Sequence, residues 1–541
     1  MSVDNTQNKR NSLDQMLNRI VLGFSKKTTY FLMVIISIGL LIRLYYVPYE
    51  LPISLDGITY FAYAFETSKL GHLPTGYYIS NNGWPVFTSF FFYILNSDNF
   101  LDYVVLQRYL AIVISVLTII PVYLLCKKFV ENHFALLGAT IFAFEPRLIQ
   151  NSVAGLAEPL FILLGSVMLL FFFSNNTKLT YVSFSIAALF ALVRSEGLLV
   201  IIPLSIMFFK KYWHHKKILM KFAIAIGIFL LTLSPMVYAR IEATGQDGFI
   251  NQYLGAGSYV SRQLIQGVQD DTYPYPPESS NYQSFYFIVR GLSNLIKFVG
   301  LALIPNFICF VPIAAILIAK NQRHKLKDYR IITMILVIIF LLIPAFWAYG
   351  RGIQEVRYIF VLFPIFTVIS CYLIKRISFR RFGTVFILIS SLILLASLTF
   401  LEFNKIDYEY EKETFLISVD IVKNTDIINA DPIDGNYLKV ARILQKWPNI
   451  DANVIYQTDK VSTSGFNSLE DFLIENKGNG LTHIVSDGKD HGTEFIKDIF
   501  YDDTKYPYLT KIYDSTEKGF MYHVKIYKMD YSIFDSIHNM K

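Results

Sequence analysis

The chain has 541 residues, of which 53% are hydrophobic and 16% aromatic, and its mean hydropathy is +0.41. These values exceed those of an ordinary soluble globular protein, which indicates a chain that needs lipid as its solvent. The net charge of +7 does not indicate nucleic-acid binding, because the basic residues lie in short clusters between apolar runs and not on one domain.

Taken in chain order, the apolar runs predict about eleven membrane-spanning helices, because a span needs about 20 mostly apolar residues and fewer where a helix stops inside the protein. The first run is too long for the apolar core of a cleavable signal peptide, so we expect it to remain as an anchor. The runs are residues 30–47, 104–125, 133–144, 156–173, 181–193, 197–209, 222–238, 302–319, 331–349, 358–374 and 382–401.

Clusters of lysine and arginine alternate between these runs and fall on one side, which the positive-inside tendency makes the cytoplasm. Residues 1–29 then form a cytoplasmic segment, residues 30–402 the membrane domain, and residues 403–541 a soluble domain on the outer side. The long outer loops are residues 48–102, 145–157 and 239–301.

Residues 181–209 are interpreted as two short helices that meet at Arg194-Ser195-Glu196. A single helix, at about 1.5 Å per residue, would overrun a bilayer core of about 30 Å and would place its charged pair at the centre. Charge at membrane depth survives where protein or water surrounds it. Short, interrupted segments therefore indicate a cavity, which we expect to open outward.

Further helices and strands are expected outside the spans. Amphipathic helices that lie on the bilayer are predicted for residues 57–70, 84–95 and 286–299. After residue 402 the composition becomes that of a soluble domain. Its predicted helices are residues 436–447 and 468–476, and its predicted strands are 453–456, 482–486, 509–513 and 520–527, the last two forming a hairpin across 515–519. The fold class is an all-α polytopic membrane domain followed by a small α/β domain.

Asp56 is the first candidate catalytic residue. It follows the first span and directly precedes a predicted amphipathic helix, so its carboxylate is expected at the outer membrane surface. The alternative is a helix N-cap, for which Asp is a favoured residue, and one side chain can serve both purposes. Glu158 is the second acidic candidate; Glu158-Pro159 opens the fourth span, where a negative charge also favours a helix N-terminus.

Arginines at the outer mouth of a lipid-facing cavity suit a lipid phosphate, because a guanidinium matches phosphate oxygens bidentately. Arg351 and Arg357 are interpreted in this way. Arg194 is a third candidate, although an ion pair with Glu196 that fixes two helices is the favoured interpretation.

Aromatic residues near these positions suit contact with sugar or acceptor: Trp84, Tyr60 and Trp347. The alternative is anchoring at the membrane interface. In the soluble part, four residues gather in THIVSDGKDHG, namely His483, Asp487, Asp490 and His491. Their spacing matches no specific metal-ligand pattern. No metal site is therefore predicted, and neither a cofactor nor a divalent cation is firmly implied.

The chain resembles the GT-C superfamily of membrane glycosyltransferases, in particular the protein O-mannosyltransferase and aminoarabinose-transferase branch. The resemblance implies that Asp56 corresponds to a first-loop acidic residue that acts as a base or positions the acceptor. Such enzymes have two adjacent acidic residues there, whereas Gly57 follows Asp56 here. The matching strings, in order, are LDGITYFAYA with Gly71, GWPVFTSFFFYIL, AEPLFILLGSVMLLFF, ALVRSEGLLVIIPL and VRYIFVLFPIF.

The resemblance implies a transferase that moves a sugar, by preference a mannose-like hexose, from a polyprenyl or dolichyl phosphate to a protein, lipid or glycan acceptor outside the cytoplasm, with inversion. The Trp-Trp-Asp motif of oligosaccharyltransferases is absent, since the nearest string is FWAY at 346–349, which disfavours transfer of a whole oligosaccharide. The alternative function is a transporter or lipid flippase without covalent chemistry.

Overall fold

The computed structural model describes most of the chain from Lys26 to His538. The described range omits residues 50–52, 54–55, 76–80, 98–99, 251–282, 321–327, 377–381, 406–408, 425–453, 457–458, 461–465, 479–480 and 488–492.

The chain divides into two compact units. The first, called the helical unit, comprises Met1–Val47, Thr75–Trp84 and Tyr109–Asn404. The second, called the sheet unit, comprises Pro48–Pro74, Pro85–Arg108 and Lys405–Lys541. Segments between residues 48 and 108 and the C-terminal part of the sequence therefore supply one unit, although several apolar runs separate them along the chain.

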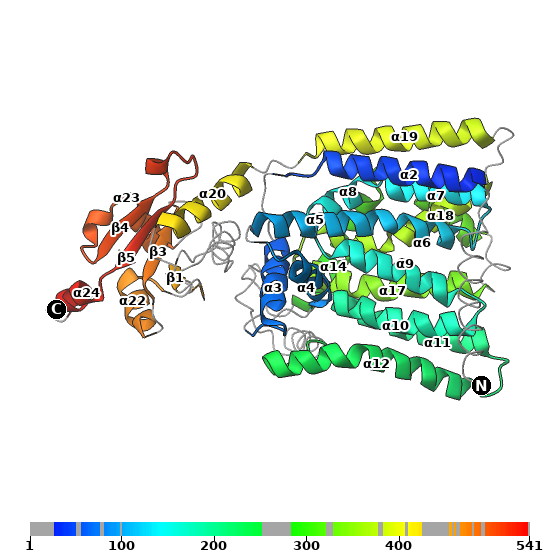
Figure 1. The fold of residues 1–541 in the computed structure, drawn as a ribbon, viewed down its shortest axis with the longest axis horizontal. Helices are drawn as coiled ribbons and strands as arrows, with labels where there is room; N and C mark the ends of the chain where they lie inside the picture. The colour runs from blue at the N-terminus through cyan, green and yellow to red at the C-terminus, as the bar shows by residue number, and fades with distance from the viewer. Residues whose placement is uncertain are drawn as a thin grey trace. The chain divides into compact units, whose positions relative to one another are not determined.

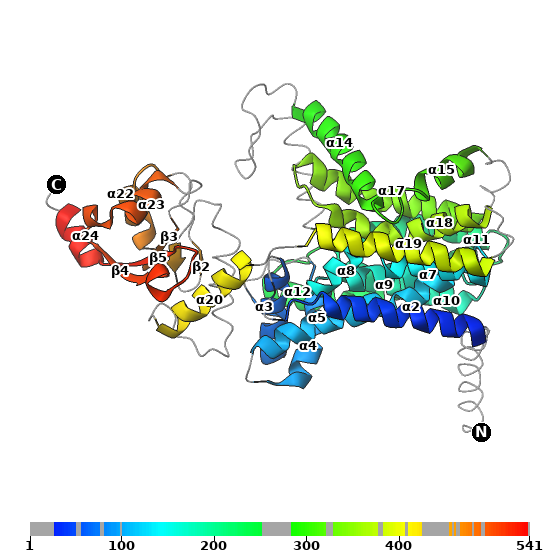
Figure 2. The same cartoon turned by 90° about the horizontal axis from the view of Figure 1, so that it is seen from above.

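Helices lie side by side in the helical unit, with α19 and α2 at one edge and α12 at the opposite edge (Figure 1). Figure 2 shows α14 and α15 beside α17 and α18, against which they pack. The elements are α2 (Lys26–Tyr45), α6 (Ile119–Cys126), α7 (Asn132–Ala143), α8 (Pro146–Val153), α9 (Glu158–Phe172), α10 (Thr177–Val193), η1 (Ser195–Val200), α11 (Ile201–Tyr212), α12 (Ile218–Thr244), α14 (Gln283–Leu303), α15 (Val311–Lys320), α17 (Tyr329–Gly350), η2 (Val356–Leu362), α18 (Phe363–Arg376) and α19 (Phe382–Phe403).

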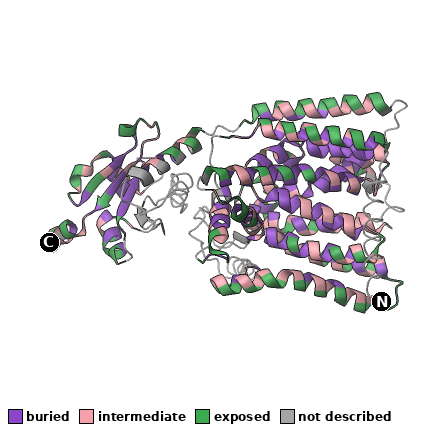
Figure 3. Cartoon of the chain, viewed as in Figure 1, coloured by how far each residue is buried: buried purple, intermediate pink, exposed green. Residues whose placement is uncertain are grey.

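Among the described residues, six helical stretches are long and apolar enough to cross a membrane. Four more apolar helices are shorter, including α7, α9 and α10. Every apolar run predicted from the sequence contains a helix, but eleven crossings remain a prediction. Burial differs across the bundle: α7 is almost wholly buried, whereas α12 and α19 are largely exposed, as expected of helices that face lipid (Figure 3).

Three helices that follow α2 belong to the sheet unit wholly or in part: α3 (Asp56–Leu70), α4 (Gly83–Leu95) and the start of α5 (Phe100–Leu117). Their aromatic rings pack together. Phe92 lies 5.3 Å from Phe61 and 5.2 Å from Tyr103 between ring centroids. The predicted helices at 57–70 and 84–95 are confirmed, and their contact surface is this aromatic cluster.

A five-stranded antiparallel sheet forms the C-terminal part of the sheet unit, in the order β2-β1-β3-β5-β4. The predicted hairpin of the last two strands is confirmed, although β5 begins later than predicted. The elements are α20 (Glu409–Asn424), β1 (Val454–Tyr456), β2 (Asp459–Lys460), α22 (Leu469–Lys477), β3 (His483–Ser486), α23 (Glu494–Tyr501), η4 (Asp503–Lys505), β4 (Leu509–Asp514), η5 (Thr516–Lys518), β5 (Lys525–Met529) and α24 (Tyr531–His538).

Alternating side chains give this sheet two apolar faces, because successive residues of a strand point to opposite sides. Ile484 and Tyr527 pack with α22, α23 and α24, whereas Val485 and Ile526 belong to the cluster that includes Ile417 of α20. Figure 2 shows α20 and α22 on opposite sides of the strands. The helix predicted at 436–447 lies outside the described residues.

Candidate active site

Glu158 is the first residue of α9 and is 3% exposed. Pro159 follows it in the first turn, where a missing N–H group costs nothing because that group has no partner inside the helix. A carboxylate at this place also interacts favourably with the positive end of the helix dipole. The Asn151 side-chain amide, from α8, donates to Glu158 Oε2 at 3.3 Å. The start of α9 thus fixes a buried carboxylate.

Arg194 lies between α10 and η1 in extended backbone, with φ −143° and ψ 125°, and is 9% exposed. Its Nη1 donates to Glu158 Oε1 at 2.7 Å, and its Nη2 donates to Glu196 Oε1 at 2.8 Å. One guanidinium therefore joins two carboxylates from different parts of the chain. We call Glu158, Arg194 and Glu196 the buried network.

The helix break predicted at Arg194 is present, and the chain reverses there. Near the end of α11, the Lys211 ammonium donates to the carbonyls of Phe172 and Ser174 at 2.5 and 2.6 Å, and to Thr180 Oγ1 at 2.8 Å. These acceptors lie where α9 ends and α10 begins. Because the end of α11 meets the start of α10, the two helices form an antiparallel hairpin with the buried network at its turn.

Aromatic rings enclose the buried network. Phe161 of α9 stacks on Phe190 of α10, with ring centroids 3.9 Å apart and planes at 4°. The Arg194 guanidinium lies 5.5 Å from the ring centroid of Tyr358, within the range of a cation–π interaction. A cavity of about 20 Å³, lined also by α17 and η2, adjoins these groups. That volume suits about one water molecule.

A second arginine acts on the buried network from η2. Burial alone would raise the pKa of Glu196, but Arg194, and more weakly Arg357, hold that pKa below its ordinary value. Arg357 also forms an ion pair with Glu355, with Nε 3.2 Å from Oε2. Arg357 therefore faces both Glu355 and the edge of the network.

Arg351 directly follows α17 and caps its C-terminal end. The next residue, Gly352, has φ +94°, a conformation that favours glycine. A Cβ atom at Gly352 would collide with the guanidinium of Arg290 from α14. Arg290 is therefore packed against the turn that carries Arg351 and leads to Arg357. Residues 350–357, called the arginine turn, carry Arg351 and Arg357, and Arg290 packs against the turn at Gly352.

The candidate aromatic residues have different environments. Trp84 is 0% exposed and follows Gly83, at which a Cβ atom would collide with the backbone of Leu192 and Val193 in α10. Trp347, in α17, lies 5.5 Å from Phe287 of α14 between ring centroids. Tyr60 lies in α3 and is partly buried.

Asp56 is the first residue of α3, in the sheet unit, and its side chain lies outside the described residues. Of the proposed THIVSDGKDHG cluster, Asp490 and His491 also lie outside them. Asp487 accepts a hydrogen bond from the Tyr522 hydroxyl at 2.8 Å. Within the described part of the chain, no group of three or more histidine, cysteine or acidic side chains is arranged to hold a metal ion.

The structure brings Glu158 and Arg194 together as candidates, with Arg357 beside them. Sequence reasoning missed Asn151, Tyr358 and the packing of Arg290. Arg290 carried a signal, since it is a charge in a largely apolar helix with a strong amphipathic pattern. The other two carried none, because a single Asn or Tyr near a helix end is ordinary.

No protein-family model and no curated protein sequence matches the chain. Solved structures do match. The oligosaccharyltransferase of Archaeoglobus fulgidus, in a complex with Zn and sulfate, has a TM-score of 0.50 at 13% identity over 84% of this chain and 68% of that one. The same archaeal enzyme, AglB, with an inhibitory peptide and a dolichol-phosphate, has a TM-score of 0.50 at 12% identity over 86% and 70%.

The chain has the fold of the GT-C membrane glycosyltransferases. A further structure with this fold is ArnT from Cupriavidus metallidurans bound to undecaprenyl phosphate, with a TM-score of 0.45 at 11% identity over 77% of this chain and 73% of that one. The resemblance to GT-C enzymes drawn from short motifs is therefore confirmed at the level of the fold.

Proposed function

We propose that this GT-C protein transfers a sugar from a polyprenyl or dolichyl phosphate to an acceptor on the outer side of the membrane. The observation that carries the proposal is a buried Glu158–Arg194–Glu196 network with Arg357 beside it, in a protein of the GT-C fold. The AglB structure with a dolichol-phosphate supports a lipid-phosphate donor. A mannose-like hexose is the favoured sugar.

The arginine turn is assigned to the donor phosphate. Guanidinium groups match phosphate oxygens geometrically and remain charged at all physiological pH values. Arg351 and Arg357 lie in the turn, and Arg290 packs against it. Arg194 is assigned a positioning role, because its two terminal nitrogens are engaged by Glu158 and Glu196.

Asp56 is assigned the role of general base. The acceptor hydroxyl attacks the anomeric carbon and gives its proton to the Asp56 carboxylate, while the bond from that carbon to the phosphate oxygen breaks. The electron pair leaves with the lipid phosphate, whose charge the arginines stabilise. A single displacement inverts the anomeric centre. General-base help contributes typically about 10²–10⁴-fold to the rate, and preorganised charges stabilise the leaving group further.

The site is assigned to the outer face, with the N-terminus in the cytoplasm, because of the lysine and arginine clusters between the spans. Nucleotide sugars are cytoplasmic, so a transferase with its site on the outer face takes its sugar from a lipid-linked donor. Trp347 and Tyr60 are assigned to sugar and acceptor contact in preference to Trp84, which is fully buried. Transfer of a single sugar is favoured over transfer of an oligosaccharide, given FWAY at 346–349.

The test is release of lipid phosphate from a radiolabelled polyprenyl-phosphate hexose by the purified full chain, with acceptor peptides and lipids supplied in parallel. Asp56→Asn should lower transfer by at least about 10²-fold and leave the thermal unfolding temperature unchanged. Asp102→Asn, in the same outer region, is the matched control and should transfer normally. A transporter or flippase would move the donor across liposomes without releasing lipid phosphate, and full activity of Asp56→Asn would refute the assigned base.

A further inference from the structure

A cavity of about 680 Å³ lies at the opposite end of the helical unit from the buried network, among the first turns of α2, α7 and α19. Its walls come from these three helices, and α7 packs against both of the others. The volume lies within the range of ordinary ligand sites, about 300–1,000 Å³. The residues that line it are Lys27, Thr28, Phe31, Asn132, His133, Leu136, Gly383, Phe386 and Ile387.

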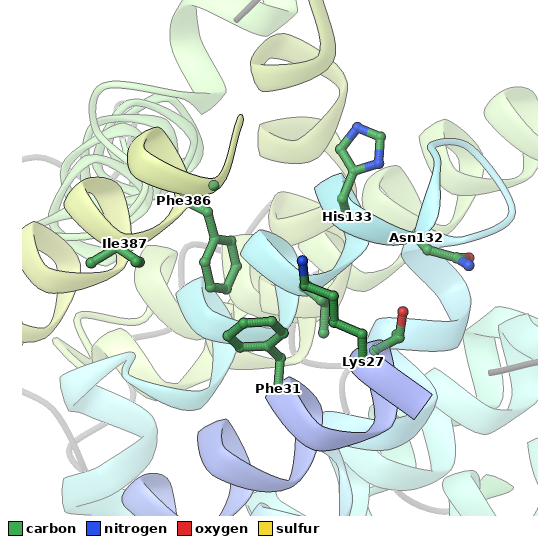
Figure 4. A pocket seen from close by; sticks show the side chains of 9 residues that line it. Lys27, Phe31, Asn132, His133, Phe386 and Ile387 are labelled. Carbon is green, nitrogen blue, oxygen red and sulfur yellow. The ribbon is translucent and has the colours of Figure 1, made fainter. Parts of the chain in front are cut away.

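The cavity is amphipathic. Phe31 of α2 and Phe386 of α19 meet edge to face, with ring centroids 5.7 Å apart, and supply its apolar wall (Figure 4). The ammonium end of Lys27 lies between these rings and His133 in that view. Gly383 leaves free space in the wall of the cavity, since a Cβ atom there would meet no atom within 4 Å.

Basic side chains lie at the polar end of the cavity. Among the described residues, Lys27 has no ion-pair partner, and Lys375 lies 3.2 Å from Glu131, the residue before α7. Glu131, which also lies 3.6 Å from His133, is the acidic group at this place and is already paired with Lys375. Three helices begin here, and their N-terminal ends add further positive potential. The arrangement favours an anionic group over a neutral one.

The apolar side of the cavity continues onto surfaces that suit lipid tails. Tyr30 and Met33 on α2, and Ile387 and Leu388 on α19, are exposed hydrophobic residues of two helices that qualify as membrane spans. An acyl chain can therefore extend from the cavity along these helices without leaving an apolar environment.

We infer that this cavity is a binding site for an anionic phospholipid of the surrounding bilayer, with its phosphate at Lys27 and its acyl chains against Phe31, Phe386 and Ile387. The inference does not depend on the proposed transferase activity. It rests on the cavity, its apolar wall and the cations at one end of it. A phospholipid held here joins α2 to α19, the first and last long spans of the helical unit.

The test is native mass spectrometry of the purified full chain in detergent, titrated with dioleoyl phosphatidylglycerol or dioleoyl phosphatidylcholine. Phosphatidylglycerol should bind preferentially, and Lys27→Gln should weaken its binding about fivefold, the effect of about one lipid-facing basic charge. Gly383→Trp, which fills the cavity from a position with free space, should abolish the preference. Lys210→Gln, an exposed lysine at the end of α11, is the control and should bind like the wild type.

Equal binding of the two lipids would overturn the inference, as would unchanged binding in both Lys27→Gln and Gly383→Trp. Undecaprenyl phosphate is the third arm of the titration. If it displaces phosphatidylglycerol at a lower concentration and Gly383→Trp abolishes its binding, the cavity belongs to the sugar carrier and not to a membrane phospholipid. Transfer activity, measured separately, should be retained in Lys27→Gln, so failure of the lipid site and failure of the transferase are distinguishable.

Discussion

The helical unit and the C-terminal sheet bury titratable side chains in opposite ways. Glu158 and Arg194 are both buried and lie 2.7 Å apart, so each charge has an opposite partner. His483 of β3 is also buried, but it lies opposite Lys528 in the sheet register. Burial, and then the charge of Lys528, lower the pKa of His483 to about 4. An opposite charge thus lies beside the buried Glu158, whereas the neighbour of His483 has the same sign and disfavours the protonated ring.

Removal of the cation from the buried network should have the largest effect. Arg194→Met leaves Glu158 and Glu196 without their shared partner, so we expect a loss of about 3–5 kcal/mol of stability. The measurement is thermal unfolding of the purified chain in detergent, followed by intrinsic fluorescence. The double variant Arg194→Met with Glu158→Gln should recover part of the loss, because one of the two carboxylates is then neutral.

Lys211→Met is the matched comparison at the other end of the same hairpin. It removes a cation that contacts neutral oxygens, so no buried carboxylate loses its partner. The loss of stability should therefore be smaller, about 1–3 kcal/mol. If Arg194→Met unfolds at the wild-type temperature, the network does not stabilise the hairpin. The contrast between a compensated charge in the helical unit and an uncompensated one in the sheet then fails.

Acid should destabilise the sheet through His483. The folded state binds a proton at a pKa of about 4, whereas the unfolded state binds one at about 6.5. Between these values the unfolded chain holds more protons, so stability falls as the pH decreases from about 6.5 to about 4, by on the order of 2 kcal/mol. Hydrogen exchange of the β3 and β5 amides in the full chain measures this effect.

His483→Gln is the control for the acid effect, because glutamine does not titrate. Its β3 amides should exchange with a flatter pH dependence, after correction for the intrinsic rate. A wild-type sheet with constant stability from pH 7 to pH 4.5 would contradict a buried neutral histidine.

The smallest effect is expected at Glu413, where a partly buried carboxylate is satisfied by backbone groups. Its two oxygens accept from the N–H groups of Met521 and Tyr522, which fastens α20 to the β4–β5 hairpin. Glu413→Gln should cost about 1 kcal/mol, since one neutral acceptor remains. Faster hydrogen exchange at residues 521–522, with unchanged exchange in α22, would agree with this local contact; a uniform change across the sheet would not.

The sequence supports prediction of the helical unit better than prediction of the site. Apolar runs and the length of 181–209 indicate the break at Arg194, because both follow from the thickness of a bilayer. The ion pair of Arg194 with Glu196 is local and was also predictable. The pair with Glu158 required knowledge of how α9 packs on α10, which no local pattern contains.

In the sheet unit, four strands were predicted and correspond to β1, β3, β4 and β5, but β2, α20 and α23 were missed. α23 has eight residues, too few for a convincing helical period, although Phe495, Ile496 and Ile499 occupy one face. α20 has Ile417 and Ile421 four residues apart among charged residues. That spacing indicates a helix with one apolar face, and in the structure this face packs on the sheet.

The antiparallel pairing of α10 with α11 has a consequence for biosynthesis. With 17 and 12 residues, both helices are shorter than the roughly 20 residues that cross a bilayer alone, and the turn between them carries a charged arginine. We expect the translocation machinery to release them into lipid together, after α9 has supplied its carboxylate to that arginine. A nascent chain in which α9 has not yet packed on α10 would leave Arg194 without Glu158, and one that stops before residue 211 would lack the Lys211 contacts that hold α11 to α10, which makes this hairpin a point at which quality control can recognise an unfinished protein.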